Sequence, residues 1–234
     1  MCSPTVIQFG TSQLLSDEIT NKKVIEVGAA NINGSLREII KRFNPLTYLG
    51  VDIFEGNGVD EICDINNLVS HFSKESFDVV ICTEVFEHVR DYRNAASNIK
   101  NLLCPNGVLL LTTRSKGFPY HGYPFDFWRY EIEDISLIFG DLIIEANYKD
   151  PSLKYPGVFL KARKPKVFNE KSLKELEIFS IIKKIRCKDI SDFEFLLFRM
   201  MMTIRRFIFN LLPSRFEIIG KMIVLKLLTR LSEK

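Results

Sequence analysis

The stretch Val24-Ile25-Glu26-Val27-Gly28, followed by Tyr48-Leu49-Gly50-Val51-Asp52, decides the fold that we predict for this chain. Each stretch is an apolar run typical of a buried β-strand; the first ends in a glycine and the second in a carboxylate. Between them, apolar side chains recur at helical spacing over residues 34–43. A strand, a glycine turn, a helix and a second strand with an acid at its tip form half of a nucleoside-binding βαβ unit.

The same alternation of strands and helices continues along the chain. Residues 77–82, which are apolar apart from Asp78, are typical of a strand in a buried parallel sheet, and residues 108–113 are predicted to form another buried strand. We therefore predict an α/β fold with a doubly wound, Rossmann-like, seven-stranded and mostly parallel sheet, followed by a C-terminal helical extension. The remaining predicted strands cover residues 59–63, 142–148 and 158–163, and the remaining predicted helices cover residues 12–20, 92–103 and 133–139.

The composition favours a cytoplasmic protein with one substantial core. The chain has 234 residues, of which 46% are hydrophobic, and its five cysteines lack CxxC spacing. We find no signal peptide and no uncharged apolar stretch of about 18 residues, so we expect no spanning helix. Because the only histidines are His71, His88 and His121 and no zinc motif occurs, we also expect no metal site.

The net charge of +3 is unevenly distributed along the chain. Residues 1–160 carry 14 basic and 21 acidic side chains, whereas residues 161–234 carry 18 basic and 8 acidic ones. This asymmetry predicts two functional parts, which are an acidic-to-neutral catalytic body over residues 1–164 and a basic amphipathic helical extension over residues 165–234.

The extension is predicted to form two or three helices, with breaks near residues 188–190 and at Pro213. Three roles fit an amphipathic basic helix: packing on its own domain or a second subunit, contact with an anionic membrane surface, and binding of nucleic acid. The stretch lacks the stacking character of single-strand binders, so we expect homo-oligomer contact or peripheral contact with the inner membrane surface through residues 193–231. The polar stripe consists of Arg199, Thr203, Arg206 and Asn210.

Together, the segments of residues 22–164 resemble the class I S-adenosylmethionine-dependent methyltransferases, including those that methylate glycans and small molecules. The order and spacing of the segments match that family throughout. The resemblance implies methyl transfer from S-adenosylmethionine to a small-molecule or glycan acceptor. Besides the two stretches quoted above, it rests on Cys63-Asp64-Ile65, Phe77-Asp78-Val79-Val80, Glu84-Val85-Phe86-Glu87-His88 and Leu102-Leu103-Cys104-Pro105-Asn106-Gly107-Val108-Leu109.

The resemblance implies cofactor contacts at the first two strands. Glu26 would lie near the methionine end of the cofactor and help to orient its ammonium group. Gly28 would permit close approach of the backbone, because glycine has no side chain. Asp52 would hold the two hydroxyls of the ribose, and Ile53 would lie beside it.

Further contacts are implied at the next two strands. Asp64 would accept a hydrogen bond from the adenine amino group, with the backbone amide of Ile65 nearby. Thr83 and Glu84 would lie beside the cofactor where the acceptor enters. Glu84 and His88 are four residues apart, and they would meet on one helical face as structural partners or in catalysis.

The glycine turn departs from the family pattern acid-x-Gly-x-Gly-x-Gly. It reads Glu26-Val27-Gly28-Ala29-Ala30-Asn31-Ile32-Asn33-Gly34-Ser35, so that Ala30 replaces the middle glycine. Since asparagine tolerates positive φ better than most residues, we expect Asn31 or Asn33 to supply the missing turn geometry. The absence of GxGxxG argues against a nicotinamide-dependent enzyme.

The acceptor is predicted to bind at the aromatic loop of residues 114–130, which follows the fifth strand at the carboxyl edge of the sheet. A very similar segment occurs in a subset of these methyltransferases, some of which look associated with cell-surface glycan synthesis. We take His121 as the candidate general base and Asp126 and Arg129 as groups that orient the acceptor. The alternative is an ordered lid packed by its own rings and fixed by an Asp126–Arg129 salt bridge.

The function that we predict is methylation of an acceptor, at oxygen. A second hypothesis is a non-catalytic S-adenosylmethionine-binding scaffold that uses its basic tail for partner or membrane association. In S-adenosylmethionine the methyl group is attached to a sulfonium, which is an activated leaving group. The protein therefore mainly aligns the nucleophile with the methyl group.

Overall fold

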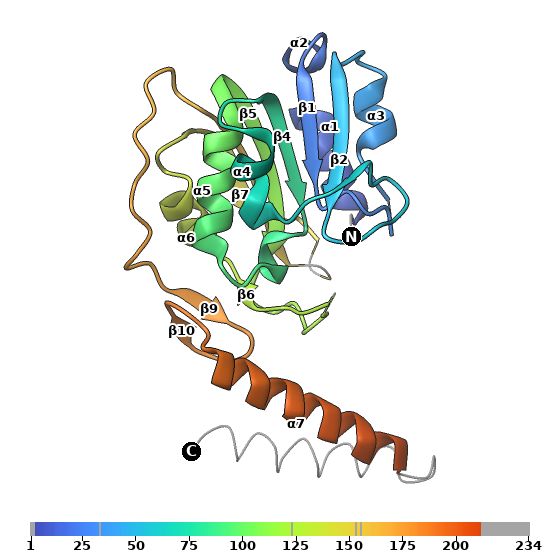
Figure 1. Ribbon diagram of the computed structural model, residues 1–234, viewed down its shortest axis with the longest axis vertical. Coiled ribbons are helices and arrows are strands. Elements are labelled where there is room, and N and C mark those ends of the chain that lie inside the picture. The colour runs from blue at the N-terminus through green and yellow to red at the C-terminus, as the bar shows by residue number, and fades with distance from the viewer. Residues whose placement is uncertain (1–2, 33, 123, 153, 155, 212–234) are drawn as a thin grey trace. The chain divides into compact units, whose positions relative to one another are not determined.

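The chain forms a seven-stranded sheet whose strands follow the predicted alternation. The computed structural model describes residues 3–32, 34–122, 124–152, 154 and 156–211. The strands are β1 (Lys23–Val27), β2 (Thr47–Asp52), β3 (Glu61–Ile62), β4 (Phe77–Thr83), β5 (Leu103–Arg114), β7 (Ile143–Lys149) and β8 (Gly157–Arg163). Their order is β3-β2-β1-β4-β5-β8-β7 (Figure 1), and only β8 runs antiparallel to its two neighbours. The predicted doubly wound, mostly parallel sheet is confirmed.

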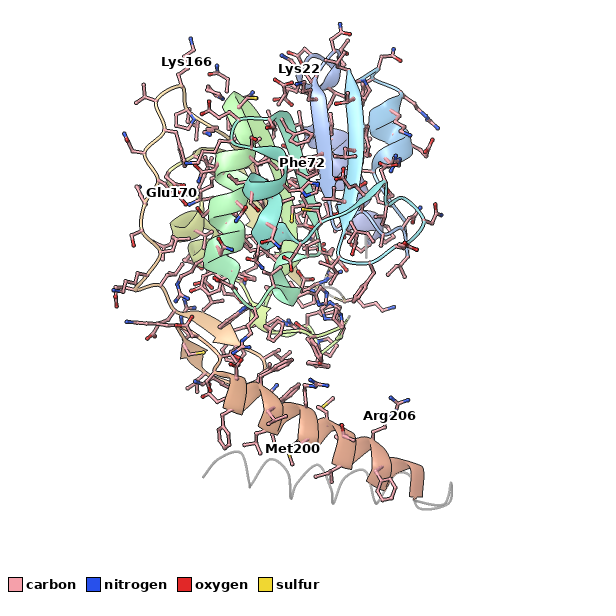
Figure 2. All side chains as sticks on the ribbon, in the orientation of Figure 1. Lys22, Phe72, Lys166, Glu170, Met200 and Arg206 are labelled. Atoms are coloured by element: carbon pink, nitrogen blue, oxygen red, sulfur yellow. The ribbon has the colours of Figure 1, made fainter. Side chains whose placement is uncertain are left out.

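Helices cover both faces of this sheet. On one face, the helices near the N-terminus pack against the sheet. Their buried side chains Val6, Leu36 and Ile40 contact strand residues such as Val24 and Val79. Figure 2 shows side chains filling the space between sheet and helices. Because both faces are covered, the middle of β4 (residues 79–82) and of β5 (residues 108–111) is apolar and buried. The helices of this part are α1 (Pro4–Gln13), α2 (Ser16–Ile19), α3 (Arg37–Lys41), α4 (Leu68–Phe72), α5 (Tyr92–Leu102) and α6 (Ile132–Ile138), and the 3-10 turns are η1 (Ile65–Asn67) and η2 (Phe86–His88).

Two helices near the N-terminus differ from their predicted bounds. The helix predicted over residues 12–20 is two helices, α1 and α2, separated at residues 14–15. The helix predicted from residue 34 begins at Arg37, because Gly34 has a φ of 126°, which is incompatible with a right-handed helix. Asn44, with a φ of 50°, follows its end.

The helix predicted between residue 165 and the break near residue 188 is wrong. This segment forms β9 (Ile178–Ser180) and β10 (Arg186–Cys187), which make a small antiparallel sheet with β6 (Trp128–Arg129). The carbonyls of Leu173 and Leu176 accept hydrogen bonds from the guanidinium of Arg93 at 2.8 and 2.7 Å. Backbone groups used in this way are withdrawn from a helix, so these contacts outweigh the local pattern.

The chain divides into two compact units, Met1–Asp189 and Ile190–Lys234. The charge pattern of the sequence predicts a boundary after residue 164, but residues 165–189 belong to the first unit because β9 pairs with β6. In the second unit the structure describes one helix, α7 (Asp192–Leu211). The predicted break at Pro213 and the later part of the predicted contact stretch lie outside the described residues. No helix in the described part of the chain is long and apolar enough to cross a bilayer.

Candidate active site

The turn after β1 requires glycine for two reasons. Gly28 has a φ of 78°, and a Cβ there would lie 2.1 Å from Cγ2 of Val85. Gly34 also has a positive φ, whereas Asn31 does not. Asn31 contributes through its side-chain oxygen instead, which accepts the N–H of Gly34 at 3.0 Å. The expectation of positive φ at Asn31 is therefore wrong, and Asn33 lies outside the described residues.

Asp52 ends β2 directly beside this turn, since Val27 and Val51 pair in register. Its Oδ2 accepts the N–H of Ala30 at 3.1 Å, and its Oδ1 accepts the N–H of Ile53 at 2.7 Å. Each carboxylate oxygen can accept a second hydrogen bond. Asp52 is thus oriented by the backbone and still able to accept from two hydroxyls, while the side chain of Ile53 is exposed.

The other predicted cofactor residues end neighbouring strands at the same edge. Asp64 follows β3, and its exposed carboxylate caps η1 by accepting the N–H of Asn66 at 2.8 Å. Ile65 is buried behind it, and Thr83 is buried at the end of β4. The strand order β3-β2-β1-β4 brings all of them into one row. This carboxyl edge is where open α/β folds bind ligands.

Glu26 is a buried carboxylate one residue before the end of β1. It accepts hydrogen bonds from the hydroxyls of Tyr48 at 2.7 Å and Ser35 at 3.4 Å. Burial raises the pKa of Glu26, while the Tyr48 hydrogen bond and the charge of Arg37 oppose the rise. A cationic group close to Glu26 would compensate for the buried charge.

Glu84 lies directly after β4 with a φ of 60°, and its side chain is buried. Its Oε1 accepts from the hydroxyl of Thr112 at 2.8 Å, and the carboxylate pairs with Arg114 at the end of β5. Burial and the nearby charge of Glu87 raise the pKa of Glu84 to about 7, against the effect of Arg114.

The predicted meeting of Glu84 and His88 on one helical face is wrong. Glu84 has left-handed backbone, and η2 starts only at Phe86, so no helix joins the two residues. The Nδ1 atom of His88 instead lies 2.6 Å from the carbonyl oxygen of Phe125.

The predicted acceptor residues form one chain of hydrogen bonds, in which Asp126 and Arg129 are buried and His121 is half-buried. Nδ1 of His121 lies 2.9 Å from Oδ2 of Asp126, whose two oxygens accept from the guanidinium of Arg129 at 2.5 and 2.6 Å. Burial opposes protonation of His121, but Asp126 and Glu87 raise its pKa to about 9. Burial also opposes ionisation of Asp126, but Arg129 and His121 lower its pKa. The salt bridge considered as an alternative role is therefore present, alongside the histidine contact.

The aromatic loop is fixed onto η2. The N–H of Phe127 donates to the carbonyl of Glu87 at 2.8 Å, and the indole N–H of Trp128 donates to the carbonyl of Val89 at 3.0 Å. Trp128 and the neighbouring Tyr130 are fully buried. This packing brings His121 to the carboxyl end of β4, although Tyr123 in the same loop lies outside the described residues.

Glu87 is a site residue that the sequence analysis does not single out. Its side chain is fully buried, Oε2 accepts from the hydroxyl of Thr113 at 2.9 Å, and Oε1 lies 3.6 Å from Nε2 of His121. Burial would raise the pKa of Glu87, but His121, His88 and Arg114 lower it. The signal in the sequence is a second carboxylate inside the Glu84–His88 segment.

The residues along this edge fit an adenosyl cofactor that carries an ammonium group. Asp52 offers two oriented acceptors for a diol, and Asp64 offers an exposed acceptor beyond it. Glu26 offers a buried negative charge at the other side of the Gly28 turn. The three carboxylates match the three kinds of donor that such a cofactor presents, which are the ribose hydroxyls, the adenine amino group and the ammonium group.

Proteins of known activity resemble the chain over this region. An O-methyltransferase of ubiquinone biosynthesis from Histophilus somni (strain 2336) is 28% identical over 133 residues, which are 50% of this chain and 54% of that protein. The match thus spans only about half of the relative's length.

Solved methyltransferase structures share the fold. A 1,6-didemethyltoxoflavin N1-methyltransferase from Burkholderia thailandensis, with bound S-adenosylhomocysteine, aligns with a TM-score of 0.55 and 13% identity over 68% of this chain and 78% of its own. The magnesium protoporphyrin IX methyltransferase of Synechocystis PCC 6803, also with bound S-adenosylhomocysteine, aligns with a TM-score of 0.52 and 19% identity over 68% and 81%.

A family model described as a methyltransferase domain matches residues 6–176, which include every strand of the sheet. The matched range contains the Gly28 turn, Asp52, Asp64 and the His121 loop. The sheet of this chain has the topology of S-adenosylmethionine-dependent methyltransferases. The chain belongs to this family of methyltransferase domains.

Proposed function

We propose that this chain is an S-adenosylmethionine-dependent methyltransferase that methylates an oxygen of a small-molecule or glycan acceptor. The observation that carries the proposal is the pairing of the Gly28 turn with Asp52, linked by the Ala30 N–H at the carboxyl edge. The similarity to an O-methyltransferase supports oxygen as the acceptor atom.

For the cofactor we propose the roles implied by the sequence. Asp52 would hold the ribose hydroxyls and Asp64 the adenine amino group, with Ile53 and Ile65 beside them. Glu26 would face the ammonium group, and Gly28 would keep the turn open to the ligand. When bound, S-adenosylmethionine supplies a methyl group on a sulfonium, and the electron pair of the broken S–C bond stays on sulfur.

For the acceptor we propose binding between Glu84 and Thr83 on one side and the His121 loop on the other. The acceptor oxygen forms the new O–C bond and must lose its proton, so a group beside it has to assist that loss. Because Asp126 and Glu87 raise the pKa of His121 to about 9, we propose that His121 performs this task when its imidazole is neutral, with Asp126 and Arg129 fixing its ring. The hydrogen bonds from Arg129 to Asp126 and between Asp126 and His121 hold the imidazole near the carboxyl edge of the sheet, where the proposed cofactor residues lie.

The test is calorimetric titration with S-adenosylhomocysteine and, separately, with NAD. We expect saturable binding of the first and none of the second, and at least a tenfold loss of affinity in Asp52→Ala with the fold retained by circular dichroism. Glu133→Ala, which removes an exposed carboxylate on α6, is the matched control and should bind as the wild type does. Unchanged affinity in Asp52→Ala would remove the assigned ribose contact, and binding without turnover on any acceptor would favour the scaffold hypothesis.

For α7 we propose association with a second copy of the chain or with a membrane surface. Figure 2 shows Met200 and Arg206 leaving the helix on different sides. Liposome flotation and light scattering of the wild type, of Leu197→Gln/Met201→Gln and of the polar-stripe control Thr203→Gln separate these partners. Among the side chains of α7 that the structure describes, the exposed apolar ones are Phe193, Leu196, Leu197, Met200, Met201, Ile204 and Phe207.

A further inference from the structure

Three potential metal ligands converge beside the acceptor side of the candidate site. They are Glu87 and His88, from η2, and His121, from the aromatic loop. Oε1 of Glu87 lies 3.6 Å from Nε2 of His121 and 3.9 Å from Nε2 of His88. One ligand atom from each residue lies within 4.8 Å of the other two.

Both imidazole rings are held by their other nitrogen. Nδ1 of His88 lies 2.6 Å from the carbonyl oxygen of Phe125, which can only accept, so this nitrogen carries the proton. Nδ1 of His121 lies 2.9 Å from Asp126, which Arg129 fixes in turn. Histidines that bind metals are oriented in this manner, by a carbonyl or a carboxylate on the opposite nitrogen. When the two rings are neutral, both Nε2 atoms therefore carry a free lone pair, and both lie near Oε1 of Glu87.

One oxygen of the Glu87 carboxylate makes no hydrogen bond with the described residues. Its Oε2 accepts from Thr113, whereas Oε1 has no hydrogen-bond partner among the residues that the structure describes. The side chain is completely buried. A buried carboxylate oxygen without a hydrogen bond is costly, and a cation between it and the two imidazoles would satisfy it.

We propose that Nε2 of His88, Nε2 of His121 and Oε1 of Glu87 bind one divalent transition-metal ion. Ligand atoms about 2.0–2.1 Å from a tetrahedral zinc ion lie roughly 3.4 Å apart, so contraction of the cluster by small side-chain rotations completes the geometry. Two imidazoles and one carboxylate suit Zn²⁺ or Fe²⁺, whereas Mg²⁺ and Ca²⁺ prefer oxygen ligands. Three protein ligands leave a position open, as in catalytic rather than structural zinc sites.

The open position on the ion could be taken by the hydroxyl of the acceptor. This role for the ion rests on the proposed function. A cation lowers the pKa of a hydroxyl that binds to it, as it does for water. His121 would then assist the loss of the acceptor's proton as a ligand of the ion, and the proton itself would pass to solvent water. The sequence-based expectation of no metal site depended on spacing, which does not reveal that His121 folds back onto η2.

The experiment is titration of the metal-free wild-type chain with Zn²⁺, by calorimetry and by equilibrium dialysis with metal analysis. We expect one equivalent bound, and a loss of affinity of about 100-fold or more in His88→Ala, His121→Ala and Glu87→Gln. The matched control is His71→Ala, which removes the remaining histidine and its exposed contact with Glu61, and which should bind Zn²⁺ as the wild type does. No stoichiometric binding, or equal loss in His71→Ala, would overturn the proposal.

A second measurement on the wild type alone covers the case in which the variants do not fold. Co²⁺ in a site of two nitrogens and one oxygen gives visible absorption bands typical of four or five ligands, and added Zn²⁺ should abolish them. Six-coordinate Co²⁺ spectra would contradict the site and indicate that His121 and Glu87 form an ion pair instead. Titration of the same samples with S-adenosylhomocysteine separates the two proposals, because cofactor binding without Zn²⁺ binding removes only the metal site.

Discussion

Opposite edges of the same sheet hold two buried clusters of charged side chains, and they differ in how fully their atoms are paired. Near the start of β5, Lys161 donates to Glu18 at 2.9 Å and to the carbonyl of Gln13 at 2.8 Å, and Arg163 pairs with Glu145 at 2.6 Å. At the end of β5, the cluster around Glu87 leaves a buried oxygen without a hydrogen-bond partner within the described chain.

The difference separates a structural cluster from a functional one. Lys161 and Arg163 are satisfied by the protein itself, so their cluster needs no ligand. Next to Glu87, Glu84 combines a buried carboxylate with left-handed backbone, and backbone of this kind gathers at functional sites. Incomplete pairing, rather than charge itself, is what indicates a site here.

The largest effect is expected for Arg129, the cation at the centre of the carboxyl-edge cluster. Replacement by methionine leaves Asp126 buried without its bidentate partner, and we expect a loss of about 3–5 kcal/mol in the free energy of unfolding. Urea denaturation measures it. The matched control is Lys149→Met, which breaks an exposed, solvent-screened pair with Glu131 and should cost far less than Arg129→Met. Equal costs for the two variants would mean that the cluster is not a cooperative buried network.

A smaller effect is expected for the glycine turn at the same edge. Gly28→Ala combines a left-handed backbone with a Cβ that clashes with Val85, so we expect a loss of about 2–4 kcal/mol. Val85→Ala should recover part of that loss in the double variant, with a coupling of about 1 kcal/mol or more. Strictly additive losses would show that Val85 does not set the requirement for glycine.

The amino-edge cluster is tested through pH. Burial raises the pKa of Glu18, but Lys161, the N–H of Leu15 and Arg163 lower it overall, to below the ordinary value of 4.5. A lowered pKa in the folded state adds stability above pH 4.5 that is lost as the pH falls through the folded-state pKa. Glu18→Gln should therefore cost about 1.5–3 kcal/mol near neutrality and progressively less at acidic pH. Denaturation at several pH values checks this, and a cost independent of pH would contradict it.

Local patterns in the sequence predicted where on the sheet the first residues of the candidate site lie, whereas their roles stay predictions. The apolar runs before Gly28 and Asp52 define neighbouring parallel strands, and parallel strands end at one edge of the sheet. The acids at those ends were therefore identifiable from their positions alone.

The rest depended on contacts between distant segments. His121 reaches Glu87 because the loop bonds to η2 through Phe127, and no spacing rule reveals that contact. Likewise, residues 178–180 form a strand because they pair with Trp128 and Arg129. Glu84 leaves the helical pattern because its backbone is left-handed, although glutamate is a good helix former.

The most direct test of the account is a crystal structure of the complex with S-adenosylhomocysteine. We predict that the ribose hydroxyls lie on Asp52, the adenine reaches the side of Asp64, and the sulfur faces the loop that carries His121. A ligand bound elsewhere, or a crevice at Gly28 filled by the protein's own side chains in the presence of excess ligand, would contradict it.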